Sequence, residues 1–236
     1  MISSLNKSWA PIGWIAAVAV VLAVGCSSPQ PIRHYEPEVV AQQVQSVTQP
    51  PSDVILAVED FSAGTAYDEQ RIVYRADQYK FDYYHFHRWA APTGQLVSDT
   101  LREVYRQTGA FKTVVGGYAT QADVVLSGRV ISLEEVDQSK KRWFGRVVVN
   151  IRLRDAKTGE LLWNDTMRVK QSMTDQSPDG LAAAISKALT KIGVDTTPKI
   201  VQYGKKSVRH RTTQPAGGSS PFKQELEKQR NLENQN

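Results

Sequence analysis

Hydrophobic and polar positions alternate in short segments between residues 53 and 203, and the period of the alternation changes along the chain. Runs rich in β-branched and aromatic residues, with a period of two, are typical of β-strands. In the longest run, Val124 and Leu126 share one face while Ser127 and Arg129 share the other. The pattern predicts strands at residues 54–58, 71–75, 79–87, 110–115, 123–135, 144–155 and 161–173.

Two other segments repeat their apolar residues every three or four positions, which is typical of amphipathic helices. The first follows Pro92, a residue suited to the first turn of a helix, and stops at Gly109. The second begins with Ser177 as its cap and Pro178 as its first residue, and we expect Pro198 to end or kink it. Its apolar stripe consists of Leu181, Ala184, Ile185, Ala188, Leu189 and Ile192.

The order of these elements predicts the fold class. Strands, a helix, further strands and a second helix favour an α+β domain, with a single antiparallel or mixed β-sheet and two α-helices packed on one face. The clearest hairpin joins the strands at 144–155 and 161–173, because Gly159 in the connecting turn permits a positive φ. The other face of such a sheet is expected to be polar or covered by a partner.

The two ends of the chain differ in composition from the domain between them. Residues 26–52 are rich in Pro, Gln, Ser and Val without a sustained period, which predicts a flexible linker. Residues 204–236 contain a Pro/Gly/Ser run followed by charged and amide residues, which predicts a disordered basic tail. The domain is therefore assigned to residues 53–203, and residues 1–25 to a signal peptide.

The signal peptide is inferred from Cys26, the one cysteine of the chain. Lys7 supplies a positive charge, and residues 12–24 form an apolar core shorter than the ~20 residues that span a bilayer. The ending Leu22-Ala23-Val24-Gly25-Cys26 resembles the bacterial lipobox, which implies that the cysteine is lipidated and becomes the first mature residue. The alternatives are an uncleaved membrane anchor and a soluble secreted protein with a spare thiol.

The net charge of +5 is distributed unevenly. Residues 204–236 carry seven basic and three acidic side chains, whereas residues 26–203 carry equal numbers of both. A neutral domain lacks the clustered positive charge typical of a nucleic-acid-binding face, so no nucleic-acid partner is expected. The loop Lys140-Lys141-Arg142 is expected to be a solvated hairpin loop, with contact to anionic lipid headgroups as the alternative.

The sequence contains no motif typical of an enzyme: no glycine-rich phosphate loop, no Gly-x-Ser-x-Gly and no His-Glu-x-x-His. His85 and His87 lie two residues apart, but a zinc site needs a third ligand, which no spacing indicates. Adjacent carboxylates such as Glu134 and Glu135 are expected to be solvated, on opposite faces of a strand. We therefore expect no catalysis, no cofactor and no metal; a catalytic carboxylate pair is the alternative that stays open.

Aromatic residues concentrate between Tyr79 and Trp89. Core packing, with hydrogen-bonded Tyr and Trp tips, accounts for most of them. The alternative is a binding face for an apolar ligand or a partner protein. The candidate contacts for a partner or lipid are Tyr79, Phe81, Tyr83, Trp89 and Trp143.

Several segments, taken together, resemble one family. They are the aromatic block from Ile72 to Pro92, Thr108-Gly109-Ala110-Phe111, Ala122-Asp123, Leu126-Ser127-Gly128-Arg129-Val130, the hairpin from Arg152 to Trp163, and the Ala-rich helix from Ala182 to Leu189. Their order and spacing over residues 54–203 resemble those of ABC-type transport auxiliary lipoproteins, the PqiC-like family. The long basic tail and the Gln/Pro-rich linker depart from the family pattern.

This resemblance implies a non-enzymatic envelope lipoprotein in an intermembrane phospholipid-transport system. Its implied partners are an ABC ATPase and permease, and an MCE-domain protein that forms a lipid-conducting tube. A homo-oligomeric ring would receive that tube at the periplasmic face of the outer membrane. Ser27 agrees with this location, because resemblance to enterobacterial lipoproteins implies an aspartate after the lipidated cysteine for retention in the inner membrane. The alternative is a periplasmic lipoprotein that activates or scaffolds a cell-wall enzyme, which fold alone does not distinguish.

Overall fold

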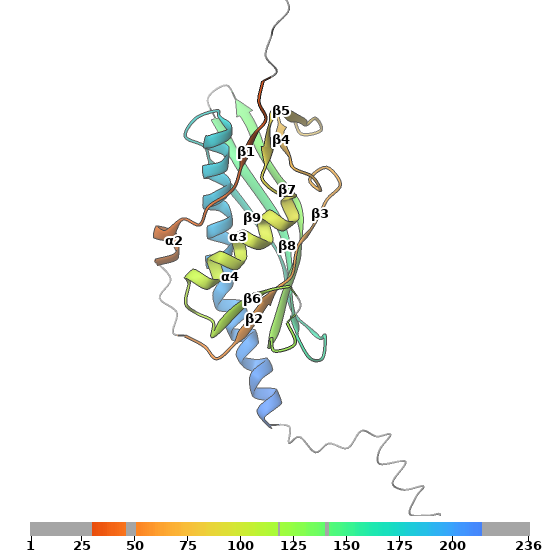
Figure 1. Cartoon of the computed structure of the whole chain (residues 1–236), viewed down its shortest axis with the longest axis vertical. Coiled ribbons are helices and arrows are strands. Elements are labelled where there is room, and N and C mark those ends of the chain that lie inside the picture. The colour runs from red at the N-terminus through yellow and green to blue at the C-terminus, as the bar shows by residue number, and fades with distance from the viewer. Residues whose placement is uncertain (1–29, 46–50, 118, 140–141, 214–236) are drawn as a thin grey trace, which may run out of the picture. The chain divides into compact units, whose positions relative to one another are not determined.

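The computed structural model describes residues 30–45, 51–117, 119–139 and 142–213, in which nine strands and three helices form (Figure 1). All nine strands belong to one mixed sheet. The predicted α+β class, with a single sheet and two main helices, is confirmed. The strands are β1 (Arg33–Tyr35), β2 (Ile55–Val58), β3 (Ser62–Ala63), β4 (Arg71–Arg75), β5 (Asp82–Trp89), β6 (Thr113–Gly116), β7 (Val124–Ser139), β8 (Arg142–Asp155) and β9 (Leu161–Ser172), and the helices are α2 (Ala41–Gln45), α3 (Thr93–Gln107) and α4 (Pro178–Thr213).

Strands β7, β8 and β9 form an antiparallel meander that is the longest part of the sheet. The turn between β8 and β9 has the chemistry expected from the sequence. Asp155 Oδ1 accepts hydrogen bonds from the backbone N–H groups of Lys157 (2.8 Å) and Thr158 (3.0 Å), and Gly159 has a φ of 74°. The hairpin predicted between these two strands is therefore confirmed.

The other edge of β7 is shared by three short strands. β2, β3 and β4 follow one another along it, each parallel to β7, through residues 56–58, 62–63 and 73–75. β6 extends the sheet beyond β2, whereas β5 and then β1 extend it beyond β4. Because each short strand pairs with β7 over only two or three residues, side chains at these junctions must contribute to holding the strands in place.

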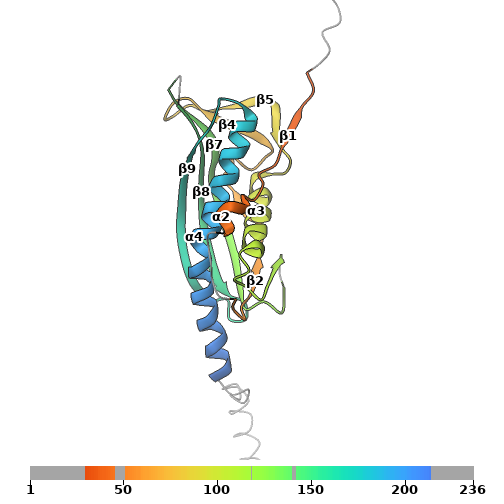
Figure 2. The same cartoon turned by 90° about the vertical axis from the view of Figure 1, so that its left-hand side faces the viewer.

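The core lies between the sheet and the two long helices, which cover the same face (Figure 2). The apolar stripe predicted for α4 is buried on its sheet side. The residues that alternate with the buried positions of β8 face away from the helices, where Arg152 and Arg154 are exposed. The fully buried residues of β8 are Val147, Val149, Ile151 and Leu153.

Helix α4 is longer than the sequence pattern predicts. It continues through Pro198, so of the two expected outcomes, an end or a kink at this proline, the end is wrong. Proline lacks the N–H that bonds to the carbonyl group four residues earlier, which destabilises a helix interior. Tertiary packing offsets this loss, because Ile200 is fully buried and the hydroxyl of Ser207 donates a hydrogen bond to Asp155. Residues 204–213 are thus helical, and the start of the expected disordered tail at residue 204 is corrected.

The segment expected to be a flexible linker is partly folded. β1 pairs in parallel with β5. Between β1 and α2, the backbone N–H groups of Glu38 and Val40 donate to the hydroxyls of Ser186 (3.0 Å) and Thr190 (3.1 Å) on α4. The domain boundary expected at residue 53 is therefore wrong for residues 33–45. Local pattern does not reveal this segment, because its partners lie far away in the sequence.

Replacing Val44 tests whether α2 belongs to the fold. The side chain of Val44 is only 4% exposed, whereas that of Gln42 is exposed. Val44→Asp buries a carboxylate without a partner, so we expect it to lower the free energy of unfolding by about 1–3 kcal/mol. Hydrogen exchange of residues 33–45 should accelerate as well. Gln42→Asp should change neither quantity; equal behaviour of the two variants would show that the segment is not docked.

Candidate interaction site at the β4–β5 end of the sheet

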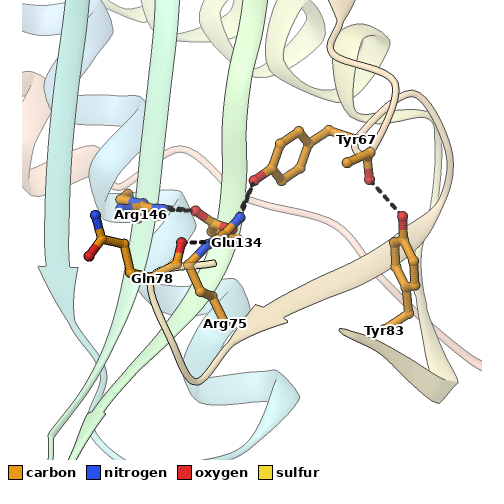
Figure 3. Close-up of polar contacts among 7 residues, drawn as sticks. Tyr67, Arg75, Gln78, Tyr83, Glu134 and Arg146 are labelled. Atoms are coloured by element: carbon orange, nitrogen blue, oxygen red, sulfur yellow. Dashed lines mark hydrogen bonds and ion pairs between the residues drawn. The ribbon is translucent and has the colours of Figure 1, made fainter. Parts of the chain in front are cut away.

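The carboxylate of Glu134 lies at the junction of β4, β7 and β8 and is 0% exposed. It points to the sheet face opposite the helices, on the same side as its cross-strand neighbour Arg146. Oε2 accepts hydrogen bonds from Tyr67 Oη (2.8 Å) and Arg75 Nε (3.0 Å), and Oε1 accepts one from Arg146 Nε (2.8 Å; Figure 3). Both oxygens are thus satisfied, as a buried carboxylate requires.

This network continues from Arg75 into the turn between β4 and β5. The guanidinium of Arg75 donates to the backbone carbonyl of Gln78 (3.2 Å) and to Tyr67 Oη (3.4 Å). Burial raises the pKa of Tyr67 to about 12; the hydrogen bond from Arg75 opposes this shift and the charge of Glu134 adds to it. The β4–β5 turn is therefore tied to the interior of the sheet through charged hydrogen bonds, which are stronger than neutral ones.

Glu135, the next residue, points to the face that the helices cover. Its carboxylate accepts a hydrogen bond from Tyr84 Oη (2.7 Å) and lines an open pocket of about 340 Å³ that also includes Asp137. Burial raises the pKa of Glu135, Asp137 adds to the rise, and the hydrogen bond from Tyr84 opposes it. The expectation of opposite faces for Glu134 and Glu135 is correct, but the expectation that they are solvated is wrong, because both are buried.

Three of the predicted contact residues come together on the β4–β5 hairpin. Tyr79 and Phe81, in the turn, are 83% and 42% exposed. The Phe81 ring packs edge-on against Tyr83 with ring centres 5.7 Å apart, and the Arg75 guanidinium lies 5.3 Å from the centre of the Phe81 ring. Tyr83 is half-buried and donates from Oη to the backbone carbonyl of Ala66 (3.3 Å). The hairpin therefore has a fixed aromatic base and an exposed aromatic turn.

The other candidate residues lie elsewhere. Trp89 is 0% exposed in the core, so the expected contact with a partner or lipid at this residue is corrected: its ring packs inside the domain. Trp143 is half-buried at the start of β8, and its Nε1 has no hydrogen-bond partner among the described residues. Cys26 lies outside the described residues.

The face of the meander opposite the helices is rich in basic side chains, although the net charge of residues 26–203 is zero. Six basic side chains from three strands point to this face, and within the described residues only Arg146 among them forms an ion pair, with Glu134. The sequence indicates this face locally, because Arg152 and Arg154, and likewise Arg168 and Lys170, are two residues apart on predicted strands. The zero net charge of the domain gave no indication of it. The six residues are Arg129, Arg146, Arg152, Arg154, Arg168 and Lys170.

Two further properties concern the part of the chain that the structure describes. His, Cys, Asp and Glu side chains there form no group of three or more that could hold a metal ion. His87 instead shares a hydrogen bond of 3.0 Å with Tyr35 Oη, between β5 and β1. None of the helices in these residues combines the length and the apolar character needed to cross a membrane.

Solved structures share this fold. A crystal structure of a Xanthomonas campestris protein, assigned to the family DUF330, is 20% identical with a TM-score of 0.64, over 75% of this chain and 99% of that chain. The crystal structure of an uncharacterized protein is 13% identical with a TM-score of 0.53, over 73% of this chain and 97% of that chain. At these identities the likeness shows the fold alone. A search of curated proteins gave no match.

These structures place the chain in a class of mixed α+β domains in which two helices cover one face of a β-meander. The model of the family described as "ABC-type transport auxiliary lipoprotein component" matches residues 36–195, and the chain belongs to this family. The resemblance inferred from the sequence is thereby confirmed. Membership makes the chain an envelope-associated auxiliary component of ABC-type transport, in a family that is not a known enzyme family.

Substitutions at the two adjacent carboxylates are expected to have different effects on stability at pH 7. Glu134→Gln removes the charge that pairs two guanidinium groups, so we expect it to lower the free energy of unfolding by about 2 kcal/mol, allowing for the partial exposure of Arg146. Glu135→Gln removes a buried charge whose pKa is raised, so stability should stay equal or increase. Urea unfolding measures both.

The pH dependence distinguishes these two roles further. The folded state holds the Glu135 proton more tightly than the unfolded state does. The stability contributed by the protonated Glu135 carboxyl group is therefore full below pH 4.5 and decreases as the pH rises through the folded pKa. Any gain from Glu135→Gln should therefore appear at pH 7 and disappear at pH 4. Equal decreases in the free energy of unfolding of Glu134→Gln and Glu135→Gln at pH 7 would contradict the environments assigned to the two carboxylates.

Tyr67 gives a second pH-dependent test. Between pH 10 and about 12 the unfolded state releases this proton while the folded state keeps it, so stability should fall with rising pH. The slope from one such group approaches about 1.4 kcal/mol per pH unit. Tyr67→Phe should remove this part of the slope in urea unfolding measured from pH 9 to 11. An unchanged slope in Tyr67→Phe would refute the assignment.

Proposed function

We propose that the chain is a non-enzymatic outer-membrane lipoprotein that docks the periplasmic tube of an MCE-domain protein and assists phospholipid movement through the envelope. In this proposal Cys26 carries the lipid anchor on the periplasmic face. The ABC permease and ATPase act at the other end of the path, and several copies of the chain form a ring at the end of the tube.

The observation that carries the proposal is the extent of the family match. It covers residues 36–195, which correspond to the folded body from the end of β1 into α4. The family description supplies ABC-type transport and the lipoprotein class. The MCE-domain protein, the phospholipid cargo, the ring and the outer membrane come from the PqiC-like resemblance of the sequence.

The geometry of the buried Glu134 carboxylate supports a role without catalysis for this residue. Glu134 uses both oxygens to accept hydrogen bonds from Tyr67, Arg75 and Arg146, and it is closed to solvent. Such saturation favours a structural role, because a general base must be able to reach the proton it removes. The exposed groups at this end of the sheet include the aromatic rings of Tyr79 and Phe81, which favour contact with a protein or lipid.

Purification from membranes tests this proposal. After cross-linking and detergent extraction, the tagged chain should bring down an MCE-domain protein. Cys26→Ala should leave the thermal unfolding midpoint unchanged but abolish this recovery, because the body would no longer be held at its membrane. Ser27→Ala, the adjacent control, should recover the partner as the parent chain does.

Two results would contradict the proposal. Recovery of cell-wall enzymes without an MCE-domain protein would favour the activator or scaffold role. Full recovery of the MCE-domain protein by Cys26→Ala would show that the anchor does not position the chain.

A further inference from the structure

The β4–β5 turn and the start of β1 lie toward the same end of the sheet. β4 leads into this turn and β5 leads away from it, because the two strands are antiparallel. β1 runs parallel to β5, with Arg33 opposite His87, so the folded chain begins from the side of the β4–β5 turn (Figure 1). β7 is parallel to β4, so β8 also starts at this end, with the exposed side chain of Arg142.

The length of chain between Cys26 and β1 limits where a bilayer can lie. Only six residues lie between Cys26 and Arg33, so these two Cα atoms are at most ~25 Å apart. Asp82, at the start of β5, is about 17 Å along the strand from the level of Arg33. The turn at the far end of β8, in contrast, lies about 45 Å away from Arg142 along that strand.

The exposed groups of the β4–β5 turn have the chemistry of a membrane interface. Tyr79 and Phe81 flank Lys80, whose side chain is also exposed. Aromatic rings are enriched where hydrocarbon meets headgroups, and a lysine can keep its ammonium group in the headgroup layer while its stem lies in the apolar region. Two large exposed rings close together form an apolar surface of the kind that marks contacts with proteins or membranes.

We infer that the β4–β5 turn is a membrane-contact site, in which Tyr79 and Phe81 lie in the headgroup region of the bilayer that holds the lipid anchor. The inference rests on the proposed function for lipidation of Cys26, and it assigns these rings to lipid rather than to a protein partner. The hydrogen bond from Arg75 to the Gln78 carbonyl connects this turn to the Glu134 junction. The body is thereby held in one orientation on the bilayer, which a tether alone does not achieve.

A fluorescent probe at Lys80 tests the contact without removing either ring. The lipidated full-length mature protein carries no other free thiol, because Cys26 is its one cysteine. Lys80→Cys is labelled with an environment-sensitive NBD probe in vesicles of phosphatidylethanolamine and phosphatidylglycerol. Lys157→Cys, at an exposed lysine of the β8–β9 turn, is the matched control at the other end of the sheet.

We expect the Lys80→Cys probe to shift to shorter wavelength and to be quenched several-fold more by headgroup-level spin-labelled lipid than the Lys157→Cys probe. Adding Tyr79→Ser and Phe81→Ser should reduce this quenching to the control level, while circular dichroism shows an unchanged fold. Equal quenching of the two probes would overturn the inference and assign the rings to protein or solvent.

Lipidation of Cys26 and membrane contact of the β4–β5 turn are tested by separate measurements. Mass spectrometry reports lipidation of Cys26 directly, and an unlipidated chain would overturn the short tether and with it the inference. If the chain is lipidated and the Lys80→Cys probe is not quenched, the membrane contact is wrong, while docking of an MCE-domain protein is still tested separately by purification.

Discussion

The structure depends on the requirement that the buried carboxylate of Glu134 be paired. β4 joins the long meander over only three residues of β7, too few for backbone hydrogen bonds alone to fix the hairpin beyond it. Glu134 supplies the missing connection, because Arg75 reaches it from β4, Arg146 from β8 and Tyr67 from the preceding loop. A buried charge with all its partners is costly to disrupt, so the junction has one preferred geometry.

This junction links the interior of the fold to its exposed surface. Through Arg75 it holds the turn that presents Tyr79 and Phe81, while β1 on the outer side of the hairpin begins the folded chain. Six residues, rather than a linker of some 26, then lie between Cys26 and β1. If Cys26 is lipidated as proposed, a short tether and an aromatic turn at one end suit an auxiliary component whose role is positional.

Much of the fold could be predicted from the sequence, because the alternation of apolar and polar residues in β8 and the apolar stripe of α4 indicate which side chains are buried. The folded segment at residues 33–45 could not, since its hydrogen bonds reach Ser186 and Thr190 on a distant helix. Continuation of α4 past Pro198 also depends on tertiary packing. In the candidate site, the sequence pattern did not indicate which aromatic residues of the hairpin are exposed. Burial of both adjacent carboxylates depends on groups from other strands and loops, which no local pattern indicates.

The most direct test of this account is hydrogen exchange, strand by strand, in the parent chain and in Glu134→Ala. If Glu134 holds the hairpin to the meander, amides of β4 and β5 should exchange much faster in the variant. Amides of the β8–β9 ladder, which pairs from Phe144 to Arg154, should keep most of their protection. Uniform acceleration throughout the sheet, or unchanged protection of β4 and β5, would contradict the central role of this buried carboxylate.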